Sequence, residues 1–321
     1  MKTPVAFIIF NRPETTKKVF EAIRQAKPPK LLVVADGSRP DQPDDVKDCA
    51  AARALIEQVD WDCEVLKNYS DVNLGCGRRV ASGLDWVFST VERAIVLEDD
   101  CLPHPCFFQF CEELLEKYQG DERIMTIRGT NELGKWKPDS QSYHFCCWPS
   151  PVWGWASWSR AWRCYDHEIK AWGNPELKAK IWAFMDDYSL FQGMAWRFEK
   201  AFRKEVDTWD WQWYFAILSN SGFAIVPSVN LVSNIGFGPK ATHTKSWRSK
   251  VINRRTYSLQ LPLSHPDAVA PDKDYHKEIL KEFSRVRPLQ KLKYQIKARL
   301  RPYKHYLLSW LNVGVAACKR K

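Results

Sequence analysis

The chain has 321 residues, of which 45% are hydrophobic and 27% charged, as is ordinary for a soluble globular protein. Its net charge of +10 is not spread evenly, because eleven of the 48 Lys and Arg residues and no acidic residue follow Glu282. Residues 1–282 therefore carry 37 basic against 38 acidic side chains, which excludes a nucleic-acid-binding body and confines the positive charge to a basic tail.

The first apolar run, residues 5–10, is too short for a signal peptide or a membrane span. None of the ten Cys residues forms a CxxC pair with downstream partners, so the sequence does not indicate zinc. We therefore expect a cytoplasmic protein with reduced thiols.

Short apolar runs alternate with helical patterns in the first hundred residues. Buried strands are predicted at 5–10, 31–35, 63–66 and 94–97, with helices reaching to about residues 26, 59 and 90. This alternation predicts an α/β fold with a doubly wound, mostly parallel sheet. Right-handed crossovers then bring the carboxyl ends of successive strands to one edge.

The second part of the chain is rich in tryptophan, with twelve of the 16 Trp residues between Trp136 and Trp213. A core helix is predicted over 107–118, strands over 124–127 and 223–227, and a polar helical region over 175–205. We expect one domain over 1–260 and an extension over 261–321. From Leu289, apolar residues recur at helical spacing between basic ones, which fits either a helix pair on an anionic membrane surface or a helix docked on the body.

Three consecutive acids, Glu98-Asp99-Asp100, end the fourth apolar run. Their mutual repulsion would be relieved by Mn²⁺ or Mg²⁺, although a solvated acidic turn is the alternative interpretation. Asn11, Arg12, Asp36 and Arg79 also follow strands or lie in the turns beside them, so they are expected to converge on the same edge.

This set of side chains suits a nucleoside diphosphate, because arginines bind phosphate and an Asp can bind a base. The indole rings further along suit the apolar faces of sugars. A transferase of nucleotide-activated sugars needs both, together with a carboxylate that deprotonates the acceptor hydroxyl.

The order of these motifs over residues 4–250 resembles the GT-A glycosyltransferases, especially the N-acetylglucosaminyltransferase I family and its bacterial family-2-like relatives. The resemblance implies that Asn11 and Arg12 belong to the first nucleotide loop, that Asp36 contacts uracil, and that Arg79 meets the nucleotide. It implies that Asp100 ligates Mn²⁺ while Glu98 and Asp99 face the ribose and the donor sugar.

Three later segments extend the resemblance. Trp153 falls in a donor-sugar and acceptor segment, and Trp209-Asp210-Trp211 matches a Trp-Asp motif whose Asp is the catalytic base, with Asp207 as the alternative base. Residues 236–243, including Thr242 and His243, resemble a loop that orders over the bound nucleotide sugar. His243 either meets the metal or diphosphate or has no such role.

The expected function is therefore metal-dependent, inverting transfer of a sugar from a UDP-sugar, such as UDP-N-acetylglucosamine, to a glycan or glycolipid acceptor. The basic tail would place the enzyme at the inner membrane leaflet. Two alternatives stay open: a sugar-phosphate nucleotidyltransferase and a Trp-rich carbohydrate-binding protein without catalysis. Residues 10–13 lack the glycines typical of the nucleotidyltransferase loop.

Overall fold

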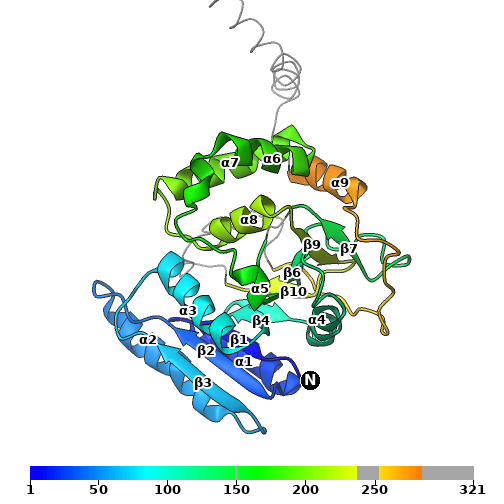
Figure 1. Ribbon diagram of the computed structural model, residues 1–321. Helices are drawn as coiled ribbons and strands as arrows, with labels where there is room; N and C mark the ends of the chain where they lie inside the picture. Colours follow the sequence, from blue (N-terminus) through cyan, green and yellow to red (C-terminus); the bar gives the residue numbers. More distant parts are fainter. Residues whose placement is uncertain (149–150, 237–252, 284–321) are drawn as a thin grey trace, which may run out of the picture.

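The computed structural model describes residues 1–148, 151–236 and 253–283 (Figure 1). The strands are β1 (Val5–Ile9), β2 (Lys30–Ala35), β3 (Glu64–Tyr69), β4 (Arg93–Glu98), β5 (Cys101–Pro103), β6 (Ile124–Arg128), β7 (Tyr143–Cys146), β8 (Trp155–Trp158), β9 (Phe223–Pro227) and β10 (Val232–Asn234). The helices are α1 (Pro13–Ala26), α2 (Pro43–Ala54), η1 (Leu55–Gln58), α3 (Cys76–Thr90), α4 (Cys106–Lys117), α5 (Ser159–Trp162), η2 (Lys170–Gly173), α6 (Pro175–Met185), α7 (Tyr188–Phe202), α8 (Asp210–Ser219) and α9 (Lys273–Phe283).

One eight-stranded sheet has the order β3-β2-β1-β4-β8-β6-β9-β7. Strands β3, β2, β1 and β4 are all parallel, as predicted. Beyond β4 the sheet is mixed, because β8 runs antiparallel to both β4 and β6, β9 is parallel to β6, and β7 is antiparallel to β9. The α/β, Rossmann-like prediction is confirmed, but the mostly parallel arrangement holds only for the first half.

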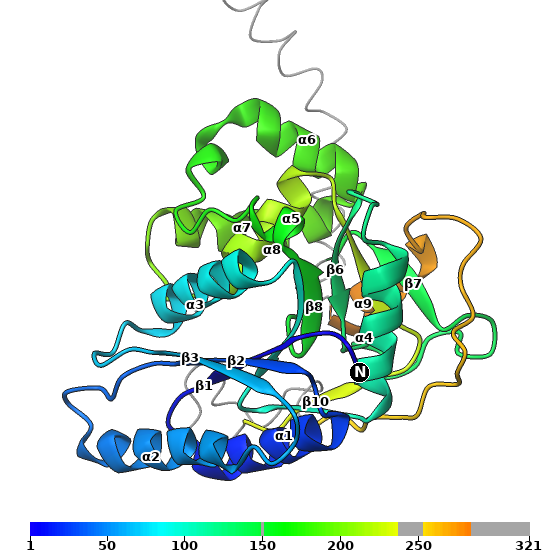
Figure 2. The same cartoon turned by 60° about the horizontal axis from the view of Figure 1, so that its bottom comes forward.

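Helices cover both faces of the sheet, and Figure 2 shows α1 and α2 on one side of β1 to β3 and α3 on the other. Every residue of β1 is buried, as expected for a strand packed on two faces. Val19, Phe20 and Ile23 line the buried side of α1, and the equivalent apolar residues of α3 to α8 divide between two cores, one on each face.

Element boundaries differ from the predictions where the sequence pattern is weak. Helix α2 begins at Pro43 and passes into η1 at Leu55. Strand β3 continues to Tyr69, beyond its predicted end, because its half-exposed residues form no continuous apolar run from which the end could be predicted. Strands β5, β7, β8 and β10 have only three or four residues, too few for a periodic pattern to develop.

The chain after residue 253 returns to the body. Leu259 and Leu263 join the core under α4, and Phe145 of β7 pairs with Pro271 just before α9. The predicted basic amphipathic helices begin at 289 and lie outside the described residues. Within the described part of the chain, no helix is long and apolar enough to cross a membrane.

Helix α9 covers a buried polar cluster, which we call the Arg128 cluster: Arg128, Glu132, His144 and Tyr275. Arg128 is fully buried and its Nη2 lies 2.6 Å from Glu132 Oε2, which also accepts a hydrogen bond from the Tyr275 hydroxyl at 2.8 Å. His144 packs against the Tyr275 ring with centroids 4.1 Å apart. Helix α9 is thus tied through the Tyr275 hydroxyl to a buried pair of matched charges at the end of β6.

Candidate active site

The acidic triplet lies in the middle of the sheet at the carboxyl end of β4, between β1 and β8. Asp99 and Asp100 are buried, and Glu98 is half-buried. Because β1 and β4 are parallel neighbours, the loop after β1 ends beside the triplet. The sequence prediction that these two segments converge is therefore matched by the structure.

Arg12, in the loop after β1, bridges two of the acids. Its Nη2 lies 2.6 Å from Asp99 Oδ1, and its Nη1 donates to Asp100 Oδ2 at 2.8 Å. The Phe10 amide donates to the other oxygen of Asp99 at 3.0 Å. A single guanidinium thus offsets part of the charge of this group, which we call the Arg12 cluster: Arg12, Glu98, Asp99 and Asp100.

Negative charge is in excess in the Arg12 cluster. Burial, followed by the charge of Asp100, raises the pKa of Glu98 to about 8, with Asp99 and Asp210 adding to the effect and Arg12 opposing it. Burial also raises the pKa of Asp99 to about 6 against the opposing charge of Arg12. Such crowding favours any ligand that brings positive charge.

Asp210 approaches this cluster from a distant part of the sequence. It is the first residue of α8, and its carboxylate accepts a hydrogen bond from the Thr208 hydroxyl. Its charge adds to the raised pKa of Glu98, which puts the two carboxylates within electrostatic reach of each other. The predicted base and the predicted metal-binding acids therefore belong to one region.

Asp207, the alternative base, has a structural task. Its Oδ1 accepts a hydrogen bond from the Gly77 amide in the first turn of α3 at 2.9 Å, across 130 residues of sequence. Gly75 has a φ of 80°, and a Cβ there would lie 2.7 Å from Asp207 Oδ2. Asp207 therefore caps α3, and glycine is required where it does so.

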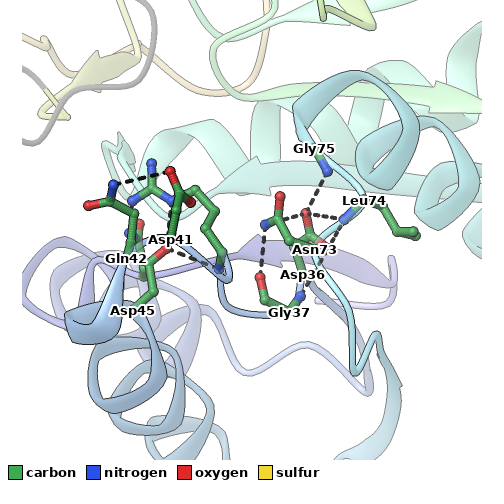
Figure 3. A network of polar contacts seen from close by, with 10 residues as sticks. Asp36, Gly37, Asp41, Gln42, Asp45, Asn73, Leu74 and Gly75 are labelled. Atoms are coloured by element: carbon green, nitrogen blue, oxygen red, sulfur yellow. Dashed lines mark hydrogen bonds and ion pairs between the residues drawn. The ribbon is translucent and has the colours of Figure 1, made fainter.

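Asp36 is the centre of a second polar network (Figure 3). Its carboxylate accepts from the amides of Gly37 and Leu74, both at 2.9 Å, from Gly75 at 3.1 Å and from the Asn73 side chain at 3.1 Å. Burial raises its pKa, while these amides and Arg79 oppose the rise. Asp36 holds the turn that leads into α3.

A neighbouring network involves Asn11 and reveals two residues that the sequence analysis did not single out. Asn11 donates to Asp45 Oδ1 at 2.7 Å, and Arg39 Nε donates to Asp45 Oδ2 at 2.6 Å. The Arg39 guanidinium lies 5.6 Å from the centre of the Phe10 ring. Sequence offers no signal for this pairing beyond the polar loop after β2, because the partners are 34 residues apart.

Arg79 was predicted to meet the nucleotide, and it is buried under the ends of β2 and β3. Its Nε donates to the Ala35 carbonyl at 3.0 Å, and its Nη2 donates to the Asn68 carbonyl and to Asn68 Oδ1. In this position the guanidinium supports the strand ends that carry Asp36.

The tryptophans divide between the site and the core. Strand β8 pairs with β4 so that Trp155 lies opposite Val96, where the pairing ends, and half-buried Trp153 precedes it and packs against the core that contains Leu97. Trp209 is buried and stacks on Trp155, with ring centroids 5.8 Å apart. Trp153 therefore lies at the carboxyl edge, whereas Trp209 packs in the core behind it.

Gly236, the first residue of the predicted loop over 236–243, lies against Asp100. A Cβ at this position would collide with Asp100 Oδ2 and lie 2.6 Å from Arg12 Nη1. The predicted loop residues Thr242 and His243 follow it and lie outside the described residues.

A divalent cation would meet the excess negative charge of the Arg12 cluster. In residues 1–148, 151–236 and 253–283, no three His, Cys, Asp or Glu side chains form a ready metal site. Mg²⁺ sites commonly use one or two carboxylates and take their other ligands from substrate phosphates and water. The hard oxygen of Asp100, beside carboxylates with raised pKa values, fits that second pattern.

Comparisons with known proteins identify no family: no protein-family model and no curated protein matches the chain. Solved structures match distantly. UDP-glucose pyrophosphorylase complexed with UDP-glucose is 11% identical, with 51% of this chain and 79% of that chain covered and a TM-score of 0.30. Mouse xyloside xylosyltransferase 1 in its apo form is 10% identical over 67% and 81%, with a TM-score of 0.33. The inositol-1-phosphate CTP transferase from T. maritima is 8% identical over 50% and 73%, with a TM-score of 0.30. These scores are low, so the function is inferred below from the residues of this chain alone.

Proposed function

We propose that this chain is a metal-dependent, inverting glycosyltransferase of the GT-A type that uses a UDP-sugar. The observation that carries the proposal is the Arg12 cluster at the carboxyl end of β4, where one guanidinium bridges two buried carboxylates, with Asp210 at the start of α8 adding to the negative charge that acts on Glu98. A sugar nucleotide needs a phosphate region and a base acting on the acceptor, and these two groups supply candidates for both.

The donor would lie along the carboxyl edge of the sheet. The turn held by Asp36 would receive the nucleoside, with the Asn11 and Asp45 network beside it. Arg12 would exchange part of its contact with Asp100 for the diphosphate, because guanidinium binds phosphate well. Trp153, two residues before the start of β8, would face the donor sugar.

The acceptor hydroxyl would lose its proton to Asp210. The freed oxygen attacks the anomeric carbon as the bond to the diphosphate breaks, so the configuration inverts. A Mn²⁺ or Mg²⁺ ion held by Asp100 would offset the charge left on the diphosphate. The first turn of α8 fixes Asp210 in place, and the Thr208 hydroxyl orients its carboxylate.

Calorimetric titration of UDP with and without Mn²⁺ tests this proposal. We expect Mn²⁺-dependent binding to the wild-type protein and at least about a tenfold loss of affinity in Asp100→Ala. Asp41→Ala, an exposed acid in the loop after β2, should bind like the wild type. Equal affinity in Asp100→Ala would contradict the metal site, and pyrophosphate release from UTP and a sugar phosphate would identify a nucleotidyltransferase instead.

A further inference from the structure

Helix α7 carries a tryptophan in an unusual environment. Trp196 is 57% exposed, and it is the single exposed residue among the fourteen tryptophans that the described ranges contain. Indole rings are normally buried, since each removes a large apolar area from water. The Lys200 ammonium lies 5.1 Å from the centre of the Trp196 ring, and the remaining exposed surface of the indole is available to a ligand.

Three more side chains surround Trp196 to form what we call the Arg197 platform: Trp148, Trp196, Arg197 and Trp211. The rings of Trp196 and Trp211 have centroids 5.9 Å apart and are inclined by 51°. The Arg197 guanidinium lies 5.9 Å from the centre of the Trp148 ring and 6.0 Å from that of Trp211. It therefore lies between two indole rings, at the outer limit of cation–π distance.

The Arg197 platform adjoins the proposed catalytic centre. Trp211 follows Asp210 in the first turn of α8. Trp148 lies seven residues before β8, the antiparallel neighbour of β4. Arg197 thus contacts one ring from the segment before β8 and one ring from the first turn of α8.

Arg197 differs from the other basic residues of its helix. Lys200 lies 3.4 Å from Glu205, and Arg203 lies 2.7 Å from Glu199. Arg197 donates to the Gly193 carbonyl at 3.2 Å, and within the described ranges it has no carboxylate at ion-pair distance. A guanidinium fixed between aromatic rings retains donors for a ligand, and its planar fork matches a carboxylate or phosphate.

We propose that the Arg197 platform is the acceptor subsite and that it selects a sugar carrying a negative charge, either a carboxylate or a phosphate. The inference rests on the proposed transferase function. The apolar face of the sugar ring would lie on Trp196 and Trp211, and the anionic group would bind Arg197. The sugar hydroxyl nearest α8 would then face Asp210.

Direct sugar binding tests the inference without catalysis. Saturation-transfer NMR is measured with methyl β-D-glucuronide, glucose 6-phosphate and methyl β-D-glucoside on the wild type and on two variants. We expect both charged sugars to bind more tightly than the neutral one. Arg197→Gln should lower their affinity at least about tenfold while changing that of the glucoside little. Trp196→Ala, which removes a side chain that is 57% exposed, should weaken all three.

Matched controls come from the last residue of α7 and its C-terminal cap. Arg203→Gln removes a cation that already has a partner, and Phe202→Ala removes another exposed ring, so both should bind sugars like the wild type. If Arg197 only holds the indoles in place, Arg197→Gln will weaken neutral and charged sugars equally, and the proposed selectivity is wrong. Binding of none of the three sugars by the wild type would also overturn it.

The same samples separate this inference from the proposed function. UDP binding in the presence of Mn²⁺ is measured on the wild type in parallel. Charge-selective sugar binding without UDP binding would keep the platform and refute the transferase. UDP binding without charge-selective sugar binding would keep the transferase and refute the platform. Comparing the glucuronide with the phosphate tells which anion is preferred.

Discussion

The Arg128 cluster and the Arg12 cluster each hold one arginine among acidic groups, and the two clusters are balanced differently. In the Arg128 cluster one fully buried guanidinium meets one carboxylate, and α9 closes over both. In the Arg12 cluster one guanidinium bridges two of three acids, with 19% of its side chain exposed, and Asp210 adds to the negative charge. The charges of the first cluster are matched, whereas the second has negative charge left over.

The difference separates groups that support the fold from groups that await a ligand. A buried pair with matched charges costs much to break and gains nothing from an added ion. A crowded set of acids with raised pKa values gains from any cation or cation-bearing ligand. The same residue type, arginine, therefore serves structure in one place and, as we propose, binding in the other.

The largest effect is expected for Asp210, the proposed catalytic base. Asp210→Asn should lower the rate of sugar transfer by roughly 10³-fold, because the amide does not accept the acceptor proton at neutral pH. The free energy of unfolding should change by less than about 0.5 kcal/mol, since the side chain is half-exposed. Transfer assays and urea denaturation check both values. Asp207→Asn is the control, and a larger loss of activity there would reassign the base.

In the Arg128 cluster, loss of a carboxylate charge should lower stability more than the same change does in the Arg12 cluster. Glu132→Gln leaves the Arg128 cation buried without its counter-ion and should lower the free energy of unfolding by about 3 kcal/mol. Asp100→Asn, the matched change in the Arg12 cluster, removes a charge from a crowded group and should cost less than about 1 kcal/mol. Urea denaturation at pH 7 measures both losses of stability. Equal losses would show that the two clusters do not differ in charge balance.

The smallest effect concerns how His144 of the Arg128 cluster makes the free energy of unfolding depend on pH. Burial lowers the pKa of His144 to about 3, below its unfolded value of 6.5. Between these pH values the unfolded chain binds a proton that the folded protein does not, so stability falls as pH falls through 6.5. The slope should be about 1.4 kcal/mol per pH unit.

Urea denaturation from pH 7.5 to 4.5 isolates this contribution by comparing the wild type with His144→Phe. The variant should lose less stability on acidification than the wild type does. His167→Phe, outside the cluster, should follow the wild type. Parallel pH profiles for the wild type and His144→Phe would show that the buried imidazole does not govern acid stability.

The sequence predicted the parallel half of the fold better than the mixed half. Runs such as that of β4, four consecutive buried residues, identify strands without further information. Strand β8 has four residues, two of them tryptophan, and no periodicity separates it from a loop. Its antiparallel position between β4 and β6 depends on contacts distant in sequence, which a local pattern does not encode.

The site divides along the same lines. Arg12 and the acids could be brought together from sequence because parallel neighbours end at one edge. Neither the burial of Arg79 beneath β2 and β3 nor the bond from Asp207 to Gly77 could be predicted, because a hydrogen bond across 130 residues leaves no trace in spacing. Sequence therefore indicated which residues gather, and the structure shows which of them already have partners.

The short turn from Leu74 to Gly77 is shared by two carboxylates. The Asp36 carboxylate accepts hydrogen bonds from the Leu74 and Gly75 amides at its beginning. Asp207, three residues before Asp210, accepts one from the Gly77 amide at its end. The nucleoside end and the base end of the proposed site are thereby tied to a single piece of backbone. A movement of the turn at Asp36 would therefore also move the backbone that Asp207 holds. In the proposed site, the positions of the donor and of the base would change together.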